Sequence, residues 1–165
     1  MAANRPKMRI IGPMVWCVIF GLVGVGTAQP PVSSMGGWEK GGTYDRLYNP
    51  QELDKIKGTV VKIQEVTPLE GMSPGVALTV EDKDGTKAVV HLGPRWFIDP
   101  KTMGIQVGDT VKITGCWADI KGQEVFMASK VKKGDHFEFK VRLTKDGTPF
   151  WTMSPEELAK ERAAD

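Results

Sequence analysis

Few side chains in this 165-residue chain could perform nucleophilic or acid–base chemistry. The chain has two histidines, His91 and His136, and two cysteines, Cys17 and Cys116. Nucleophilic catalysis needs a base, usually histidine, beside the nucleophile. No motif places a serine or Cys116 beside either histidine. We therefore expect a protein without catalytic residues that is not an enzyme, and we interpret Cys116 as a partly buried strand residue.

Metal or cofactor binding would need ligands at suitable spacing. The histidines, Cys116 and the methionines are soft ligands that would suit copper(I), but they show no close spacing. Met127 occupies an apolar strand position, which favours core packing. The chain also has no phosphate-binding loop and no dinucleotide fingerprint. The sequence therefore predicts no metal and no cofactor.

The N-terminal segment has the composition of a targeting sequence. Arg5, Lys7 and Arg9 precede an uncharged, largely apolar stretch over residues 10–28. A basic start, an apolar centre and small residues at Gly26 and Ala28 are typical of a secretory signal peptide, here cleaved after Ala28. The alternative is an uncleaved membrane anchor, because the stretch approaches the ~20 residues that span a bilayer. We expect a periplasmic or secreted protein, membrane-anchored if the segment is retained.

Cleavage would change the charge balance and the cysteine count. Losing the three basic residues of the segment changes the formal net charge from +2 to −1. One cysteine, Cys116, would remain, so no intramolecular disulfide could form. A near-neutral net charge gives no argument for a polyanion-binding surface over the whole molecule.

The rest of the chain divides into three parts by composition. Residues 29–49 form an arm rich in glycine, proline and serine, which is typical of a flexible or extended tether. Aromatic residues such as Trp38, Tyr44 and Tyr48 are unusual in a pure linker. Part of the arm could pack along the domain, or it could bind a partner. Residues 50–151 form the predicted barrel, and residues 152–165 form a helical tail.

The barrel is predicted from apolar residues that recur with a period of two. Asp84-Gly85 and Lys121-Gly122 indicate hairpin turns, Gly58 indicates a bulge or bend, and residues 93–106 show no clean period. A small closed barrel accounts for this order better than a sandwich, since the strands are few. We predict an all-β, OB-fold-like barrel of five or six strands with a short C-terminal helix. The expected strands are residues 56–66, 76–81, 87–92, 109–120, 123–132 and 136–143.

The helix is expected over residues 155–163. Ser154 is a favourable N-cap, Pro155 suits the first turn, and Glu157 completes a capping box.

Several segments resemble a group of exported bacterial OB-fold proteins. The runs are YNPQELDKIKGTVVKIQEV, GMSPGVALTV, HLGPRWFID, VGDTVKITG and KKGD. The resemblance covers about residues 48–151, and HLGPRWFID is its most specific part. Members of this poorly characterised group carry OB-fold, DNA-binding-like or magnetosome-associated labels. The resemblance implies an OB fold, an exported protein and an association with redox proteins, and it carries over no catalytic residues.

A binding site is expected on the face of the second and third strands and in the adjoining loops, where OB barrels bind ligands. Trp96 and Phe97 are interpreted as a plug at one barrel end. The cluster Lys130, Lys132 and Lys133 is interpreted as a solvated sheet edge. The candidate ligand- or partner-binding residues are Met72, Ser73, Thr79, Lys87, His91, Arg95, Trp96 and Trp117.

The main functional hypothesis is a non-enzymatic exported module that binds an envelope protein partner or a small ligand. It could be accessory to a redox or metal-handling system. The alternative is a domain that binds single-stranded nucleic acid. That alternative is less favoured, because the strand face lacks a stacking aromatic ring and the net charge is near zero.

Overall fold

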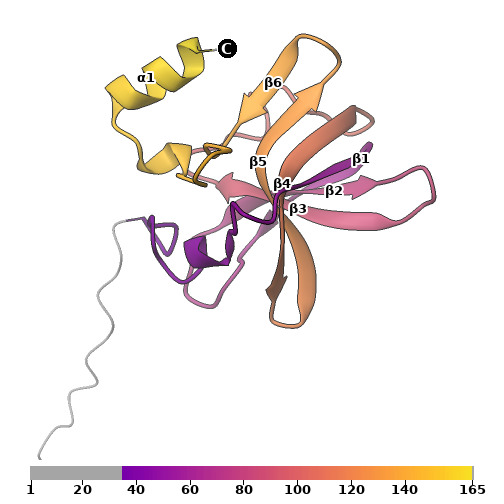
Figure 1. The fold of residues 1–165 in the computed structure, drawn as a ribbon. Helices are drawn as coiled ribbons and strands as arrows, with labels where there is room; N and C mark the ends of the chain where they lie inside the picture. The colour runs from indigo at the N-terminus through magenta and orange to yellow at the C-terminus, as the bar shows by residue number, and fades with distance from the viewer. Residues whose placement is uncertain (1–34, 165) are drawn as a thin grey trace, which may run out of the picture. The chain divides into compact units, whose positions relative to one another are not determined.

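The computed structural model describes residues 35–164, which lie in one compact unit. The sheet contains six strands, and the C-terminal helix α1 follows two 3₁₀ turns, η1 and η2 (Figure 1). The elements are η1 (Asp45–Leu47), β1 (Asp54–Val66), β2 (Gly75–Glu81), β3 (Lys87–Pro94), β4 (Thr110–Ile120), β5 (Gln123–Lys133), β6 (Phe137–Lys140), η2 (Phe150–Thr152) and α1 (Pro155–Ala163).

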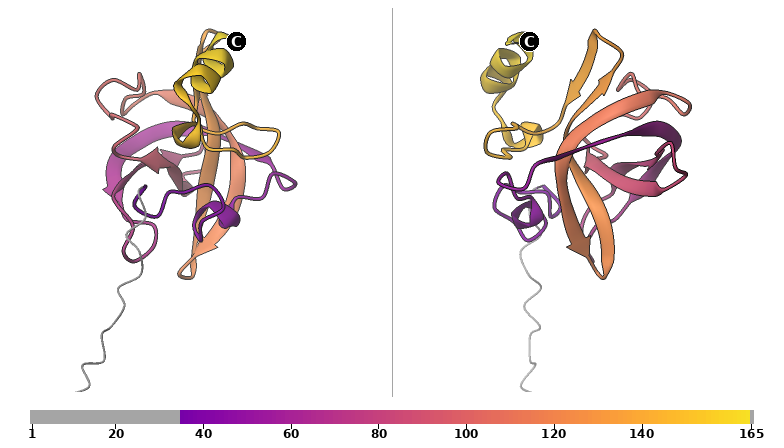
Figure 2. Two further views of the ribbon diagram at one scale, coloured as in Figure 1. Left: turned by 90° about the vertical axis from the view of Figure 1, so that its left-hand side faces the viewer. Right: turned by 45° about the vertical axis from the view of Figure 1, so that its right-hand side comes forward.

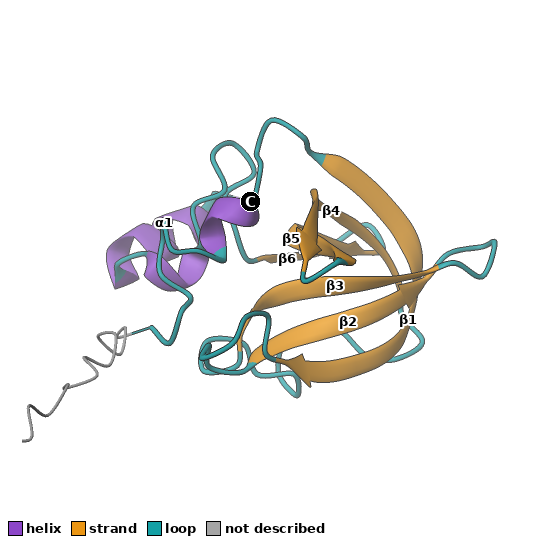
Figure 3. Ribbon diagram, turned by 90° about the horizontal axis from the view of Figure 1, so that it is seen from below, coloured by secondary structure: helices purple, strands orange, loops and turns teal. Residues whose placement is uncertain are grey.

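Five of the strands close into a ring. Antiparallel pairing joins the strands in the order β3-β2-β1-β4-β5-β6, and a parallel contact between β3 and β5 completes the ring. Figure 3 shows β1, β2 and β3 curving along one side of this ring. β6 continues the sheet beyond β5. The predicted fold class, an all-β barrel of five or six strands with a short C-terminal helix, is confirmed.

Alternation along the strands separates a buried interior from an outer face. Ile113 of β4 is buried and lies opposite Val131 of β5, whereas the flanking Lys112 is exposed. The alternation changes phase at a bulge, where Thr114 pairs with Lys130 but Gly115 pairs with Ala128. The extra β5 residue at this bulge is Ser129, whose hydroxyl donates to the Thr114 carbonyl.

Two local predictions for the strands are wrong. The register of β1 shifts between Val60 and Lys62 rather than at Gly58. At Gly58 the strands approach closely, because a Cβ there would run into the Glu81 carbonyl. The last strand ends at Lys140 rather than at residue 143, because the amides of Val141 and Arg142 both donate to the Ser129 carbonyl and interrupt the regular pairing with β5. Arg142 is buried.

The arm packs on the barrel from Met35 onward, as one of the two interpretations expects (Figure 2). Trp38 is 1% exposed, and Tyr44 and Tyr48 are also buried. The Trp38 indole donates to the Ser73 carbonyl at 2.9 Å. The segment contributes three aromatic rings to the core.

The helix α1 has the predicted bounds and the predicted capping box between Ser154 and Glu157. Among the described residues, no helix is both long and apolar enough to cross a membrane. The predicted signal peptide or anchor, residues 1–28, lies outside the described residues.

Candidate functional site

A hollow of about 290 Å³ lies where the 67–74 loop approaches the β4–β5 hairpin. Strands β1, β3, β4 and β5 contribute its walls. Valines and Ile120 supply much of the apolar lining. The polar lining comes from Gln64, Thr67, His91, Lys121 and Gln123.

His91 enters the hollow from β3 and is held by the arm. The side chain is 6% exposed, and its Nδ1 lies 3.1 Å from the hydroxyl of Tyr44. The two rings stack with centroids 6.0 Å apart and an interplanar angle of 28°. Burial raises the pKa of Tyr44, so the phenol stays protonated. Burial lowers the pKa of His91 to about 4, so the imidazole is neutral at pH 7.

These contacts select one tautomer of His91. The buried Tyr44 hydroxyl hydrogen has no other acceptor among the described residues, so it is best satisfied by donating to Nδ1. The ring hydrogen then resides on Nε2. Nε2 has no hydrogen-bond partner among the described residues, and it is not one of their fully buried, unpartnered atoms. It is therefore open to the hollow that His91 lines. His91 therefore offers a neutral N–H donor there.

Lys121 supplies the charge of the hollow. It is the one charged residue among the described lining residues, and no described carboxylate forms an ion pair with it. Its φ is +54°, and Gly122 follows with φ +76°, which is typical of a type I′ hairpin turn. Asn or Gly is preferred at that position, so lysine costs on the order of 1 kcal/mol. The acids of the hairpin, Asp119 and Glu124, lie opposite each other in the strand register, on the other face from Ile120 and Gln123.

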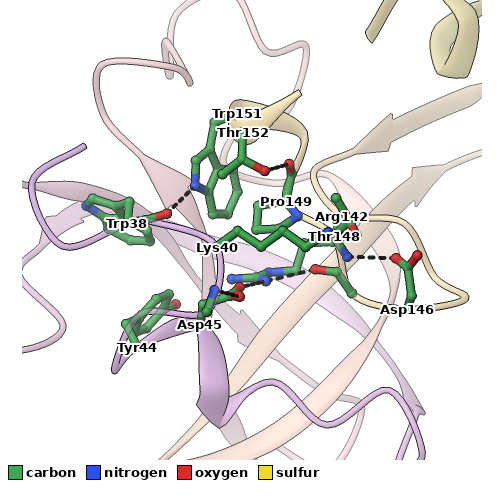
Figure 4. A network of polar contacts seen from close by, with 12 residues as sticks. Trp38, Lys40, Tyr44, Asp45, Arg142, Asp146, Thr148, Pro149, Trp151 and Thr152 are labelled. Carbon is green, nitrogen blue, oxygen red and sulfur yellow. Dashed lines mark hydrogen bonds and ion pairs between the residues drawn. The ribbon is translucent and has the colours of Figure 1, made fainter. Parts of the chain in front are cut away.

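A buried network fixes the arm that holds Tyr44 (Figure 4). Arg142 is 2% exposed and donates to Asp45 at 2.5 Å. Its guanidinium lies 4.9 Å from the Tyr48 ring centroid and 5.0 Å from that of Trp151. The Trp151 indole in turn donates to the Trp38 carbonyl at 2.8 Å. The network joins the arm to the segment after β6, so it positions Tyr44 against His91.

The loop residues predicted to bind a ligand contact the arm instead. Ser73 receives the Trp38 indole on its carbonyl, and its amide donates to the Gly36 carbonyl at 2.8 Å. Met72 packs against the core beneath Gly37. This part of the expected binding surface is therefore covered by the chain itself.

The strand residues predicted for the site do not converge on the hollow. Thr79 lies on β2 opposite Val89. Lys87 is at the start of β3 and forms an exposed ion pair with Glu81 at 3.5 Å. Of the eight predicted site residues, His91 alone is among the residues that line the hollow.

The predicted aromatic residues are separated from the hollow as well. Trp96 is 52% exposed, so its interpretation as a barrel plug is wrong. Phe97 packs instead, edge-on against Trp151 at a centroid distance of 6.2 Å. Arg95 pairs loosely with Asp99 at 3.9 Å.

Trp117 is 36% exposed at one end of the barrel. It packs against Phe126 and donates to Asp54 at 3.2 Å.

Cys116 is buried on β4, and its sulfur accepts the Asn49 amide at 3.3 Å. Burial raises the pKa of this thiol, which suppresses thiolate formation. Within residues 35–164, no group of three or more His, Cys, Asp or Glu side chains is placed to hold a metal ion.

Sequence reasoning missed Tyr44, Lys121 and Arg142 as parts of this region. The type I′ position of Lys121 could have been read from Lys121-Gly122 between two strands. Nothing in the local pattern pairs Tyr44 with a residue of β3, or Asp45 with Arg142, because these contacts span 47 and 97 positions.

Comparison with known proteins identifies a family that the sequence matches. Residues 52–138 match the model of the MamS/MamX magnetosome protein family. The match covers the five strands of the ring, and it excludes the arm and Arg142. No curated protein matches the chain. Since the matched region is more than half of the chain, this protein belongs to the MamS/MamX magnetosome protein family.

Proposed function

We propose that this chain is a non-enzymatic accessory module of the cell envelope that binds a small ligand in the hollow beside His91. We also assign the barrel to the OB fold. The ring order β1-β2-β3-β5-β4 with one parallel contact supports that assignment. The hollow lies between the first loop and the β4–β5 turn, where OB barrels bind ligands.

The observation that carries the proposal is the contact of the Tyr44 hydroxyl with His91 Nδ1, which assigns the ring hydrogen to Nε2, an atom without a partner among the described residues. A neutral N–H donor with access to a hollow binds an acceptor atom, and Lys121 favours an acceptor that carries negative charge. A small carboxylate or phosphate satisfies both groups. The apolar walls would contact the remainder of the ligand.

The envelope location rests on the sequence of residues 1–28, which has the pattern of a secretory signal. Family membership supports an accessory role in a specialised system. A link to redox or metal handling is the finer part of this proposal, and the resemblance to exported proteins is its support.

The experiment is a titration of the full-length protein with acetate, phosphate, acetamide and methylammonium, followed by NMR of the His91 ring nitrogens. We expect saturable shifts of Nε2 with the two anions, weaker shifts with acetamide and none with methylammonium. Lys121→Asn should weaken anion binding by about tenfold, a loss typical of one charge-assisted contact. Lys83→Asn, in the turn of the other hairpin, is the matched control and should bind as the wild type does. If none of the four probes shifts the His91 signals saturably, the small-ligand function is wrong.

An envelope protein partner is the second candidate, and the exposed Trp96 favours it. Partly exposed tryptophan and arginine side chains are typical of binding hot spots. Phe97, packed on Trp151, fixes the loop that presents Arg95 and Trp96. A partner that co-purifies with the wild type and is lost with a folded Trp96→Ala variant would support this candidate.

Single-stranded nucleic acid receives less support as a ligand. Stacking needs several exposed rings along a groove. Trp117 packs on Phe126, and Tyr44 is buried against His91.

A further inference from the structure

The strand registers gather six lysines on one outer face of the sheet. Lys57 of β1 lies opposite Lys112 of β4, which lies opposite Lys132 of β5. A second row runs through Lys55, Thr114, Lys130 and Lys140 across β1, β4, β5 and β6. We call these six residues, Lys55, Lys57, Lys112, Lys130, Lys132 and Lys140, the lysine face.

The lysine face points away from the barrel interior. Its neighbours along the strands, Ile56, Ile113 and Val131, form the row on the opposite side of the sheet. Ile113 and Val131 are fully buried, and Ile56 packs against the core. Successive side chains of a strand alternate between faces, so the lysines lie outside. Figure 1 shows the four contributing strands beside one another.

One carboxylate lies within this face. Glu138 is 2.7 Å from Lys132, 3.6 Å from Lys130 and 3.7 Å from Lys140. Burial opposes ionisation of Glu138, but the three lysines together lower its pKa. No ion pair with a described residue involves Lys57 or Lys112. Glu81, Asp82 and Asp84 of the β2–β3 hairpin line a hollow together with Lys55 and Lys57, at one border of the face.

The near-neutral net charge therefore conceals a separation of charge over the surface. The interpretation of Lys130, Lys132 and Lys133 as a solvated sheet edge is also wrong. β5 lies between β4 and β6 and has no free edge along these residues. Lys133 alternates to the other side and binds Asp109 at 3.0 Å.

The arrangement works against stability, which points to a binding role. Like charges directly opposite each other on a sheet are destabilising. Here Lys112 faces lysine on both sides, and Lys130 faces Lys140. Neither fold closure nor edge protection requires these positions to be basic.

The chemistry of the face indicates which polyanion fits. No aromatic ring lies in either lysine row, so bases would have no stacking platform. Lysine is a hydrated point charge that attracts phosphate without the planar geometry of arginine. The two rows form an array about 7 Å apart along the strands and about 5 Å apart across them, which suits a surface rather than a single strand.

We propose that the lysine face docks the protein on the surface of an anionic lipid bilayer. Clusters of four to eight basic residues bind anionic headgroups in this way. The apolar stretch over residues 10–28 supports this choice, because the sequence predicts that it enters a membrane during export or as an anchor. This site is separate from the hollow beside His91, and it does not depend on the proposed small ligand.

The test is flotation of the full-length protein with vesicles of phosphatidylcholine alone or mixed with phosphatidylglycerol, at low and high salt. Insertion of an apolar segment does not require lipid charge, but Arg5, Lys7 and Arg9 beside that segment also attract anionic lipid. The contribution of the lysine face is therefore the part of the excess that the variants below remove. We expect this excess at low salt and its loss at high salt.

The main variant is the triple substitution Lys57→Gln, Lys112→Gln and Lys132→Gln. It should reduce the affinity for phosphatidylglycerol vesicles by about tenfold or more. The matched control is Lys101→Gln, Lys145→Gln and Lys160→Gln, which removes the same charge from exposed positions outside the two lysine rows and should leave the excess nearly unchanged. Glu138→Gln adds one positive charge to the face and should strengthen binding. This opposite effect keeps the test decisive if the triple variant folds poorly.

Equal binding to the two kinds of vesicle would overturn the proposal, as would equal losses in the two triple variants. Binding of the wild type and the lysine variant to duplex DNA tests whether the face prefers another polyanion to the bilayer. If the lysine variant loses DNA binding while phosphatidylglycerol vesicles bind neither protein, the face recognises nucleic acid and the bilayer proposal is wrong.

Discussion

The two ends of the β4–β5 hairpin differ in chemistry on the outer side of the sheet: one end is apolar and covered, and the other is basic and exposed. Near the turn, the outward residues are Cys116, Ala118 and Ile120 with Val125 and Met127, all buried. The arm reaches this end through Asn49, which donates to Cys116. At the other end, the outward positions include Lys112, Lys130 and Lys132.

The Ser129 bulge separates the two ends of the hairpin. The comparison teaches that one surface is closed by the chain itself, with a small hollow left beside His91. The other surface, the lysine face, is not covered by the described part of the chain, and its charged side chains lie outside the core. The closed surface depends on packing and should be sensitive to truncation. The open surface contributes little to stability and should tolerate substitution.

The largest expected effect is the loss of the arm's central anchor. Trp38→Ala should lower the free energy of unfolding by about 3–5 kcal/mol, because it leaves a cavity among buried aromatic rings and an unpaired Ser73 carbonyl. Trp96→Ala, at a half-exposed tryptophan, should change it by about 0.5 kcal/mol or less. Denaturant unfolding measures both. Similar losses for the two variants would contradict the arm's role as part of the core.

An intermediate effect concerns pH and the His91 contact. The pKa of His91 is lowered from 6.5 to about 4 in the folded protein, so the unfolded chain binds more protons between these values. Stability should therefore rise with pH across this window and fall as acid is added. The glutamine of His91→Gln can still accept a hydrogen bond from Tyr44 but does not titrate. The loss of unfolding free energy on acidification should therefore be smaller by roughly 2–3 kcal/mol in this variant.

The control for that measurement is His136→Gln, at an exposed histidine. It measures the effect of the same substitution at a histidine outside the contact with Tyr44. A His91→Gln profile that follows the wild type would mean that His91 is not held neutral by burial.

The smallest effect should have the opposite sign. Lys112→Thr removes a lysine that faces Lys57 and Lys132, so it should raise the free energy of unfolding by about 0.5 kcal/mol at low salt. Added salt should shrink the gain, because screening weakens repulsion between exposed charges. A salt-independent loss of stability would show that Lys112 is held by packing and not opposed by its neighbours.

Elements with local signals were predicted well. The turn between β2 and β3 contains Asp84-Gly85, as predicted. The helix α1 has the bounds that Ser154, Pro155 and Glu157 indicate. The last strand was predicted too long, because the alternating pattern continues through Arg142. That residue is buried because Asp45 and two aromatic rings surround its guanidinium.

The candidate site was predicted in one residue, His91. Met72 and Ser73 were assigned to a ligand, but the arm covers them. The signal for this was present in the aromatic residues of the arm, although their partners could not be identified. A period of two shows that a strand has two faces, and it does not show which segment lies over each face.

By itself the sequence determined the strands, the tight turns, the capped helix and the scarcity of catalytic groups, because these follow from neighbours in the chain and from side-chain chemistry. Only the tertiary structure decided that Tyr44 orients His91, that Arg142 is buried, and that lysines from four strands form one face. Those features depend on ring closure and on cross-strand register. A register is a relation between distant segments, so no local pattern specifies it.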